Sequence, residues 1–335
     1  MNTTNLENRA SRLKGKRILV IGDIMLDHYT WGEIHRLNPE EQGAPLLEVS
    51  RDSYVLGGAA NVAHNVRRLG NEVTLYGLVN ENDNAGQEII QLCQKQGINL
   101  VHFNDRRPTT IKQRLMAGNR QIVRVDREEK IKIGDATTER ILAAIKKELG
   151  NYDGVILSDY NKGLFTSNLV EGIKGTAGDY DLKCFVDAKP ANAELFRGVY
   201  MMTPNLSEAE GMVNRTIDTG DCESGGDLNQ AIIQLTKILG TQQTIITLGP
   251  KGIVSYHQEE QRFQYSPAQI EEVFDVSGAG DTALTVLALS TIAGLTPKES
   301  IELANLAAGV AVSKVGTYQV NIEEIVEHGT SLGFQ

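Results

Sequence analysis

The feature that most constrains the fold is a regular alternation of short apolar runs and longer amphipathic segments in the second half of the chain. Apolar runs short enough for buried strands occur at 155–157, 184–186 and 244–248. Between them, residues 166–175 and 227–239 place apolar side chains at helical spacing. Strands that alternate with helices in this way predict an α/β protein with one parallel or mostly parallel sheet, covered by helices on both faces.

The first half of the chain adds a second kind of β structure to this pattern. Residues 17–23 form an apolar run closed by Gly-Asp, and Asp27 follows at the strand end where open α/β sheets place ligands. Residues 31–54, 98–103 and 111–125 instead alternate apolar with polar side chains, and Gly118-Asn119 lies between two runs of the last segment. That arrangement predicts a hairpin in a small β layer standing off the main sheet.

The whole chain is expected to form one domain. Its 335 residues contain no internal repeat and no linker rich in Pro, Gly or Ser. A single α/β domain of this length is ordinary. We therefore predict a single domain over 1–335, with a β lid formed by about 29–55 and 98–127.

Composition and charge exclude several classes of function. The formal net charge of −10 disfavours general binding to nucleic acid, although it permits a phosphorylated small molecule in a locally basic cleft. No apolar run approaches the ~18 residues of a membrane span, and residues 1–16 lack the apolar core of a signal peptide. The three cysteines are scattered, as in a reducing compartment. We expect a cytoplasmic protein without a nucleic-acid or membrane partner.

The segment Asp275-Val276-Ser277-Gly278-Ala279-Gly280-Asp281 carries the strongest chemical indication. It precedes an apolar run with helical spacing, so its small residues are expected to form the first turn of a buried helix. Free N–H groups and the helix dipole make such a terminus an anion site. Asp281 could serve there as a base for an attacking hydroxyl, or it could stabilise the helix start.

Four further places at strand ends or helix starts could hold ligands. The segment Gly57–Asn61 fits either close helix packing or, together with Asp27, a polyhydroxy ligand. Residues 158–163 could present a carboxylate and a lysine, or form a solvated turn. Asn205 and Glu208 have the spacing of a capping box as well as of a functional pair, and residues 247–252 could face phosphates.

These motifs, taken in order, resemble the ribokinase (PfkB) family of sugar kinases over about residues 16 to 325. The motifs are Gly57 to Gly70, Asn205-x-x-Glu208, Thr247-Leu248-Gly249 and Asp275 to Asp281. The resemblance implies a ribokinase-like three-layer α/β/α sandwich with a small β-sheet lid. It also implies an ATP-dependent carbohydrate kinase that uses Mg²⁺.

The resemblance assigns each motif a role. Asp281 would be the catalytic base, and Gly278, Ala279 and Gly280 would form the anion hole. Asn205 and Glu208 would organise Mg²⁺ through water. The residues implied for the nucleotide are Asn205, Thr247, Gly249, Lys251, Asn305, Ala308 and Gly309, and those implied for the sugar are Asp27, Gly57, Gly58 and Asn61. Arg114, Lys162 and Lys189 are the candidates for a phosphate on the substrate. Family members often carry a monovalent cation such as K⁺, expected here near Asp275 and Gly316.

Within the family, the chain is most similar to kinases of D-glycero-β-D-manno-heptose 7-phosphate, which serve ADP-heptose and lipopolysaccharide-core biosynthesis. The similarity rests on residues 22–27, 36–40 and 157–163. It implies phosphorylation of that sugar phosphate, at the anomeric carbon. In that group the kinase is often fused to a nucleotidyltransferase domain, which we do not expect in a chain ending at Gln335.

Three departures from the family concern the sugar pocket and local packing more than the phosphate chemistry. Thr285 and Val286 replace very small residues, 187–189 reads Asp-Ala-Lys where Asp-Pro-Lys is usual, and the segment 41–45 differs. Two alternatives therefore stay open: a kinase for another sugar, sugar phosphate or nucleoside, and a non-catalytic sugar-binding regulator.

Because exposed lid strands commonly pair between subunits, a homodimer through the lid is expected.

Overall fold

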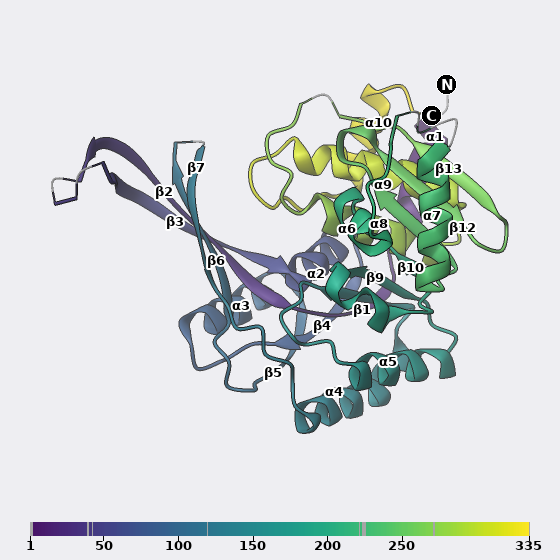
Figure 1. Cartoon of the computed structure of the whole chain (residues 1–335), viewed down its shortest axis with the longest axis horizontal. Coiled ribbons are helices and arrows are strands. Elements are labelled where there is room, and N and C mark those ends of the chain that lie inside the picture. The colour runs from purple at the N-terminus through teal and green to yellow at the C-terminus, as the bar shows by residue number, and fades with distance from the viewer. Residues whose placement is uncertain are drawn as a thin grey trace.

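The computed structural model describes residues 3–38, 40–41, 43–118, 120–220, 222, 226–270 and 272–334. Across these ranges the chain forms a large sheet with helices on both faces, and a long β lid that projects away from this core (Figure 1). The expected turn at Gly118-Asn119 includes a residue outside the described ranges, as does the segment 41–45.

The main sheet is mostly parallel, as the alternating pattern predicted. Within the described residues its order is β13-β12-β11-β10-β9-β8-β1-β4-β5. Strands β5 through β11 in this order pair in parallel, while β12 and β13 form an antiparallel extension. The strands are β1 (Arg17–Gly22), β4 (Glu72–Leu78), β5 (Asn99–Phe103), β8 (Gly154–Asp159), β9 (Cys184–Ala188), β10 (Met201–Met202), β11 (Gln243–Thr247), β12 (Ile253–His257) and β13 (Arg262–Ser266).

Helices cover both faces of this sheet. On one face lie α1 (Thr3–Ser11), α2 (Ala59–Arg68), α3 (Asn84–Lys95), α8 (Ala279–Ile292), α9 (Pro297–Val312) and α10 (Ile322–Ser331). On the other lie α4 (Asp135–Glu148), α5 (Ser167–Asp179), α6 (Leu206–Val213) and α7 (Gly226–Leu239). Short 3₁₀ segments occupy Leu149–Asn151, Pro190–Phe196 and Gly249–Lys251. The three-layer α/β/α sandwich is thereby confirmed.

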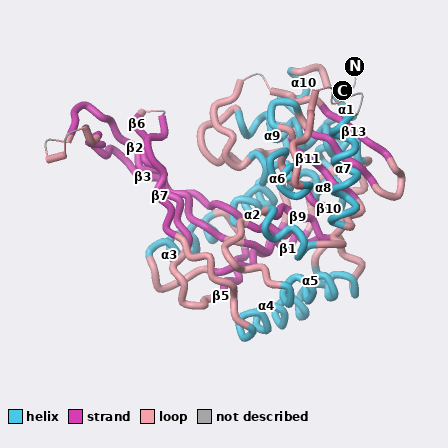
Figure 2. The backbone as a smooth tube through the Cα atoms, viewed as in Figure 1, coloured by secondary structure: helices cyan, strands magenta, loops and turns pink. Residues whose placement is uncertain are grey.

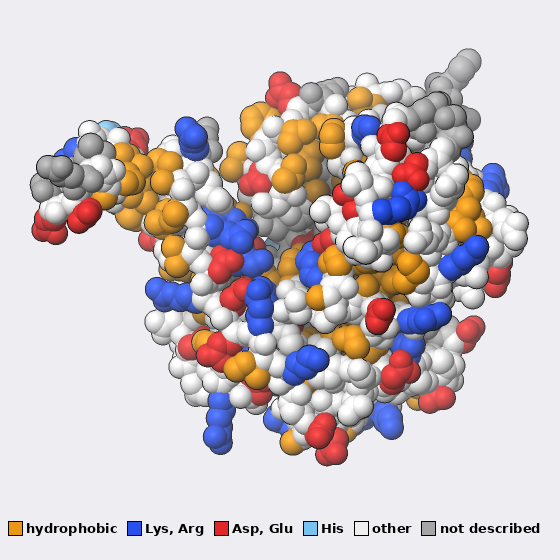
Figure 3. Space-filling model, viewed as in Figure 1, with side chains coloured by type: hydrophobic (Ala, Val, Ile, Leu, Met, Phe, Trp, Pro, Cys, Tyr) orange, Lys and Arg blue, Asp and Glu red, His pale blue; other side chains and the backbone are white. Residues whose placement is uncertain are grey.

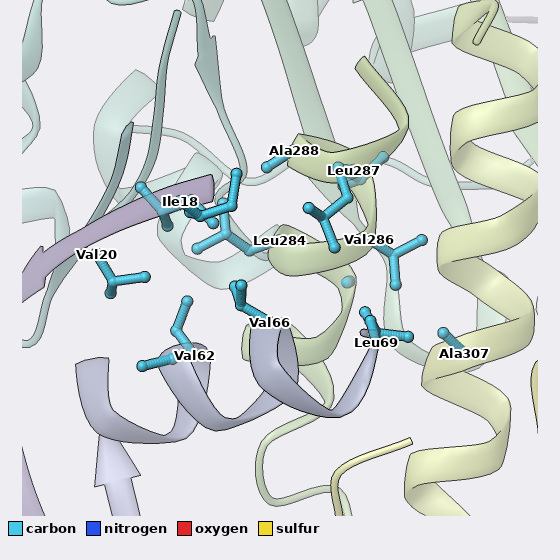
Figure 4. Close-up of a cluster of buried hydrophobic side chains, with 14 of the residues drawn as sticks. Ile18, Val20, Val62, Val66, Leu69, Leu284, Val286, Leu287, Ala288 and Ala307 are labelled. Atoms are coloured by element: carbon cyan, nitrogen blue, oxygen red, sulfur yellow. The ribbon is translucent and has the colours of Figure 1, made fainter. Parts of the chain in front are cut away.

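The two faces of β1 explain why its sequence is apolar throughout. Ile18 and Val20 belong to one buried cluster, whereas Leu19 and Ile21 belong to the cluster on the opposite face. A central parallel strand is buried on both sides, so alternation of apolar and polar residues is lost. Figure 4 shows Ile18 and Val20 packed among side chains of α2 and α8, the helix that carries Asp281.

The lid is a separate four-stranded sheet. Its strands are β2 (Ile24–Leu37), β3 (Pro45–Gly58), β6 (Thr110–Ala117) and β7 (Arg120–Arg127), in the order β3-β2-β6-β7. Figure 2 shows these strands running from the core into the projecting arm. Strand β2 starts two residues after the central strand β1 ends, so the root of the lid lies at the carboxyl edge of the main sheet.

The predicted lid range 98–127 was wrong at its beginning. Residues 99–103 form β5, which pairs in parallel with β4 at the edge of the main sheet. Residues 99–103 mix polar and apolar side chains as a lid strand does, so the sequence pattern alone could not separate the two. The β-α-β connection through α3 decides the matter, because it returns the chain to the same sheet. The assignment of all residues to a single domain stays a prediction.

None of the helices within the described ranges combines the length and the apolar character that crossing a membrane requires.

Candidate active site

Side chains from four strand ends and two helix starts converge on one pocket. It opens at the carboxyl edge of the sheet, where open α/β folds bind ligands. The residues that line it are Tyr160, Asp187, Lys189, Thr203, Asn205, Glu208, Thr247, Gly278, Gly280 and Asp281. Seven of these are predicted site residues, and the structure brings them together from four distant parts of the chain.

The small residues before α8 leave its first turn open to the pocket. Gly278 precedes the helix with φ of 82°, a left-handed conformation that favours glycine, and a side chain there would meet Thr317 at 2.8 Å. A side chain at Gly280 would instead meet open space. The helix has no side-chain cap, so its first N–H groups are available to an anion.

Asp281 is buried, at 4% exposure, in the first turn of α8. Asn61 donates a hydrogen bond from Nδ2 to Asp281 Oδ2 at 2.7 Å, and the hydroxyl of Tyr160 donates to Oδ1 at 2.9 Å. Burial raises the pKa of Asp281 to about 6, while the two hydrogen bonds act in the opposite direction. The carboxylate is thus ionised at neutral pH and fixed in orientation, as a general base requires.

A second hydrogen bond ties Asn61 to the last loop of the chain. Gln319 donates from Nε2 to Asn61 Oδ1 at 2.8 Å. Both functional ends of the Asn61 amide are therefore occupied, one by Gln319 and the other by the carboxylate of Asp281. The structure places Asn61 directly on the candidate base, and its predicted contact with the sugar stays a prediction.

Tyr160 is held in place by a carboxylate beneath its loop. Asp23, at the end of β1, accepts hydrogen bonds at Oδ2 from the backbone N–H groups of Tyr160 and Lys162, at 2.9 and 3.0 Å. Asp23 is 5% exposed, and burial raises its pKa to about 6. The Gly-Asp that closes the first strand therefore fixes the loop that carries one partner of Asp281.

An acidic and basic cluster forms the opposite wall of the pocket. Asn205 and Glu208 form a capping box at the start of α6, because each side chain accepts a hydrogen bond from the other's backbone N–H. The second oxygen of Glu208 accepts from Lys189 Nζ at 2.5 Å. The structural alternative for Asn205 and Glu208 is thus realised, and both residues nevertheless line the pocket.

Asp187 adds an oxygen without a protein donor to this wall. Its Oδ1 is buried and has no hydrogen-bond partner among the described residues. Burial raises the pKa of Asp187 to about 7, and Lys189 opposes that shift. An orphaned carboxylate oxygen beside Glu208 and Asn205 fits hydrated Mg²⁺, a cation that takes oxygen ligands and keeps several waters. No group of three or more His, Cys, Asp or Glu side chains that could hold a metal ion occurs in the described ranges.

The predicted sugar residues meet at the root of the lid. Arg114 on β6 donates to Asp27 Oδ1 on β2 at 2.5 Å, and the side chain of Asp27 is 8% exposed. An added side chain at Gly57 would come within 2.5 Å of Asp27 Oδ2. Gly57 is therefore required for the position of Asp27, and the ion pair with Arg114 fixes that carboxylate at the entrance to the lid.

The predicted nucleotide residues divide into two groups. Thr247 forms a β-bridge with Asn205 and lines the pocket, so it lies beside the candidate metal residues. Lys251 follows on the same loop, and its amino group donates to the hydroxyl of Thr219 at 2.9 Å. Thr247 therefore lies at the pocket, and Lys251 lies four residues further along the chain, in the 3₁₀ segment that follows β11.

The remaining nucleotide candidates lie on α9. Asn305 is 5% exposed, and its Nδ2 donates to the backbone oxygen of Ser266 at 2.8 Å. Gly309 lets α9 approach the backbone of Gln269, with which an added side chain would collide. Both residues therefore pack α9 closely against the end of β13 and the loop that follows it. Their contact with adenine, like that of the half-buried Ala308, stays a prediction.

Two acidic groups and a tyrosine in the site escaped the sequence reasoning. Tyr160 and Asp187 line the pocket, and Asp23 supports it from below. All three follow or end a strand, which was the available indication. Within the segment 187–189 only Lys189 has a predicted role, although the structure places Asp187 as well as Lys189 in the pocket with Asp281.

The fold and this site define a carbohydrate kinase of the ribokinase type. The pfkB family of carbohydrate kinases matches residues 16–324, so the chain belongs to that family and is an ATP-dependent sugar kinase. The predicted family, fold class and enzyme class are confirmed.

The chain is similar to proteins named bifunctional protein HldE. It is 38% identical over 318 residues to that of Sulfurimonas denitrificans and 39% identical over 316 residues to that of Nitratiruptor. In both cases 94% of this chain matches 65% of the relative, so the chain spans about two thirds of their length. Solved structures share the fold: phosphofructokinase-2 from Escherichia coli, with a TM-score of 0.77 at 15% identity over 95% of this chain and 100% of that one, and Arabidopsis thaliana ribokinase, with 0.71 at 18% over 94% and 98%.

Proposed function

We propose that this kinase transfers the γ-phosphate of ATP to the anomeric hydroxyl of D-glycero-β-D-manno-heptose 7-phosphate, in the synthesis of ADP-heptose for lipopolysaccharide. The observation that carries the proposal is the similarity to HldE proteins along 94% of the chain, together with the heptose-kinase motifs at 22–27 and 157–163. A locally basic site supports it, because Lys and Arg side chains gather where the lid joins the core of this acidic protein (Figure 3).

The arrangement accounts for the transfer chemistry. The ionised carboxylate of Asp281 takes the proton of the sugar hydroxyl as its oxygen forms a bond to the γ-phosphorus. The bond between that phosphorus and the β,γ-bridging oxygen breaks, and ADP leaves with the electron pair. The N–H groups of the first turn of α8 stabilise charge on the transferred group. Mg²⁺, when bound near Asn205, Asp187 and Glu208, neutralises phosphate charge.

A monovalent cation is proposed at the loop before α8. Asp275 accepts hydrogen bonds from the backbone N–H groups of Ser277 at 2.9 Å and Gly316 at 3.0 Å, so it joins two loops beside the anion hole. A structure of the related phosphofructokinase-2 was solved in complex with potassium. Equal turnover in K⁺ and in a large organic cation would contradict this proposal.

Association through the lid is also proposed. Tyr54, Val123 and Val125 are 41 to 46% exposed. The strand register places these three on one face of the lid, which we call the outer lid face, opposite Asp27 and Arg114. Every described residue of the edge strand β7 is exposed. An apolar face bordered by an open edge favours pairing with a second copy of the chain.

The direct test is ADP release from Mg²⁺-ATP with a panel of sugars, each assayed with and without its terminal phosphate. Turnover confined to heptose 7-phosphate is the expected result. Turnover with another sugar would retain the kinase and exclude the heptose assignment. Measurable ATP binding without turnover on any sugar would favour the regulator instead.

A further inference from the structure

The cations predicted to hold the substrate's phosphate are already paired with carboxylates. Arg114 pairs with Asp27, and Lys189 pairs with Glu208. Lys162 forms an ion pair with Glu128, which also approaches Lys130. The nearby Arg124 on β7 pairs with Asp126 at 2.9 Å. Each of these positive charges is neutralised by a partner before any substrate arrives, so none of them alone explains an added anion site.

Lys112 differs from all of them. It lies on β6 opposite Asp27 of β2, so it projects from the inner face of the lid toward the pocket. Its amino group lies 5.3 Å from the centre of the Tyr160 ring. Within the described ranges, its amino group has no ion-pair or hydrogen-bond partner, although it is half-buried. A partly buried ammonium group without a direct ion-pair partner carries a desolvation cost, and an arriving anion reduces that cost.

The charged groups around Lys112 also favour an anion at this place. Burial lowers the pKa of Lys112, and the nearby ammonium group of Lys162 lowers it further. The carboxylates of Asp27 and Asp126 act on this pKa in the opposite direction. Each of them is already paired with an arginine, Asp27 with Arg114 and Asp126 with Arg124, as Glu128 is with Lys162. The positive charge of Lys112 is therefore left in excess on this face. In a chain with a net charge of −10, this local excess marks the inner lid face as a site for an anion.

We propose that Lys112 binds the phosphate carried by the sugar substrate and thereby sets the preference of this kinase for a phosphorylated sugar. This inference rests on the proposed function. Tyr160 lies between the two groups that would hold the substrate. The Tyr160 hydroxyl contacts Asp281, and the amino group of Lys112 lies over the Tyr160 ring. A sugar lying along Tyr160 presents its reacting hydroxyl to the base and its phosphate to the lid. The phosphate then holds the lid over the site, which excludes water.

The test compares binding of heptose 7-phosphate and unphosphorylated heptose by calorimetry, in the presence of a non-hydrolysable ATP analogue. In Lys112→Gln we expect the affinity for the phosphorylated sugar to fall about 10- to 100-fold, the range of a lost hydrogen bond to a charged group. The affinity for the unphosphorylated sugar and the KM for ATP should not change. Lys112→Arg should restore most of the phosphate preference. Lys132→Gln, an exposed lysine beyond the lid, is the matched control.

The outcomes separate this inference from the proposed function. If Lys112→Gln keeps the full preference for the phosphorylated sugar while folding normally, the role of Lys112 is excluded and the heptose assignment stands. If the wild-type enzyme acts on a different phosphorylated sugar, the heptose assignment fails, and the same loss with that sugar in Lys112→Gln supports Lys112. Equal binding of phosphorylated and unphosphorylated sugars by the wild-type chain overturns the inference.

Discussion

At the scale of single residues, the carboxylate of Asp281 combines two opposing requirements. Burial excludes water from the transferred phosphate, but it also favours the protonated acid, which cannot act as a base. The hydrogen bonds from Asn61 and Tyr160 stabilise the ionised form. The pKa of about 6 is the balance of these effects, and it leaves the base ionised at neutral pH.

Replacing this base should abolish turnover and spare the nucleotide site. In Asp281→Asn we expect kcat to fall by about 10³-fold or more, because the amide cannot accept the hydroxyl proton. ATP binding, measured by calorimetry, should stay within about twofold of wild type because the proposed role of Asp281 is toward the sugar hydroxyl and not toward the nucleotide. Turnover within tenfold of wild type would exclude Asp281 as the base.

Tyr160 should set the pH at which the base titrates. The ionised form of Asp281 is the active one, so kcat/KM should fall as pH drops through about 6. Tyr160→Phe removes a hydrogen bond that favours the ionised form, so it should move this acidic limb to higher pH. Because Asp187 titrates nearby, the limb reports a coupled pair, and Asp187→Asn provides the comparison. An acidic limb unmoved in Tyr160→Phe would show that the tyrosine does not position the base.

At the scale of elements, two lid strands, β2 and β3, connect the lid to the core. Strand β2 runs from the end of β1 into the lid, and β3 returns through Gly57 to the start of α2. Asp27, the predicted sugar residue, lies on the first of these strands. Close approach of the second strand, at a residue without a side chain, holds that carboxylate in place.

A methyl group at Gly57 should therefore weaken sugar binding selectively. In Gly57→Ala the new carbon would lie 2.5 Å from Asp27 Oδ2, so the carboxylate must move. We expect the KM for the sugar to rise at least about tenfold, with the KM for ATP unchanged. Gly175→Ala is the control, because a side chain there meets open space on α5. An unchanged sugar KM in Gly57→Ala would argue against the role of Asp27.

At the scale of the whole molecule, the lid has two faces of different character. The inner face carries the basic side chains Lys112 and Arg114 toward the site. The outer lid face presents Tyr54, Val123 and Val125 to solvent. A lid that closes over substrate on one side and pairs with a second copy on the other would link assembly to the geometry of the site.

Charge on the outer lid face should prevent that pairing. In Val123→Asp/Val125→Asp we expect a shift from dimer to monomer in light scattering, because two buried charges would face each other across the interface. The core should stay folded, since these residues belong only to the lid sheet. Ile131→Asp, at a more exposed apolar position beyond the lid strands, should leave the dimer intact. A monomeric wild-type chain at assay concentrations would contradict the proposed dimer.

The sequence alone determined the features whose causes are local. The three-layer α/β/α class follows from alternating strand and helix patterns, because period and length reflect burial of each element. The uncapped helix start that is proposed as the anion site was predicted from Gly278 to Asp281, since the free N–H groups of a helix start belong to the helix itself. The family motifs, present in the expected order along the chain, also predicted the reaction class.

Tertiary structure decided the features that depend on pairing. Asp281 meets Tyr160 and Asn61 across separations of 121 and 220 residues, and no local pattern encodes such contacts. The same holds for charge: Lys162 and Lys112 are both basic in sequence, yet only the fold shows that Glu128 neutralises one of them. The edge strand β5 was misplaced for the same reason, because an alternating pattern fixes what a strand buries but not which sheet it joins.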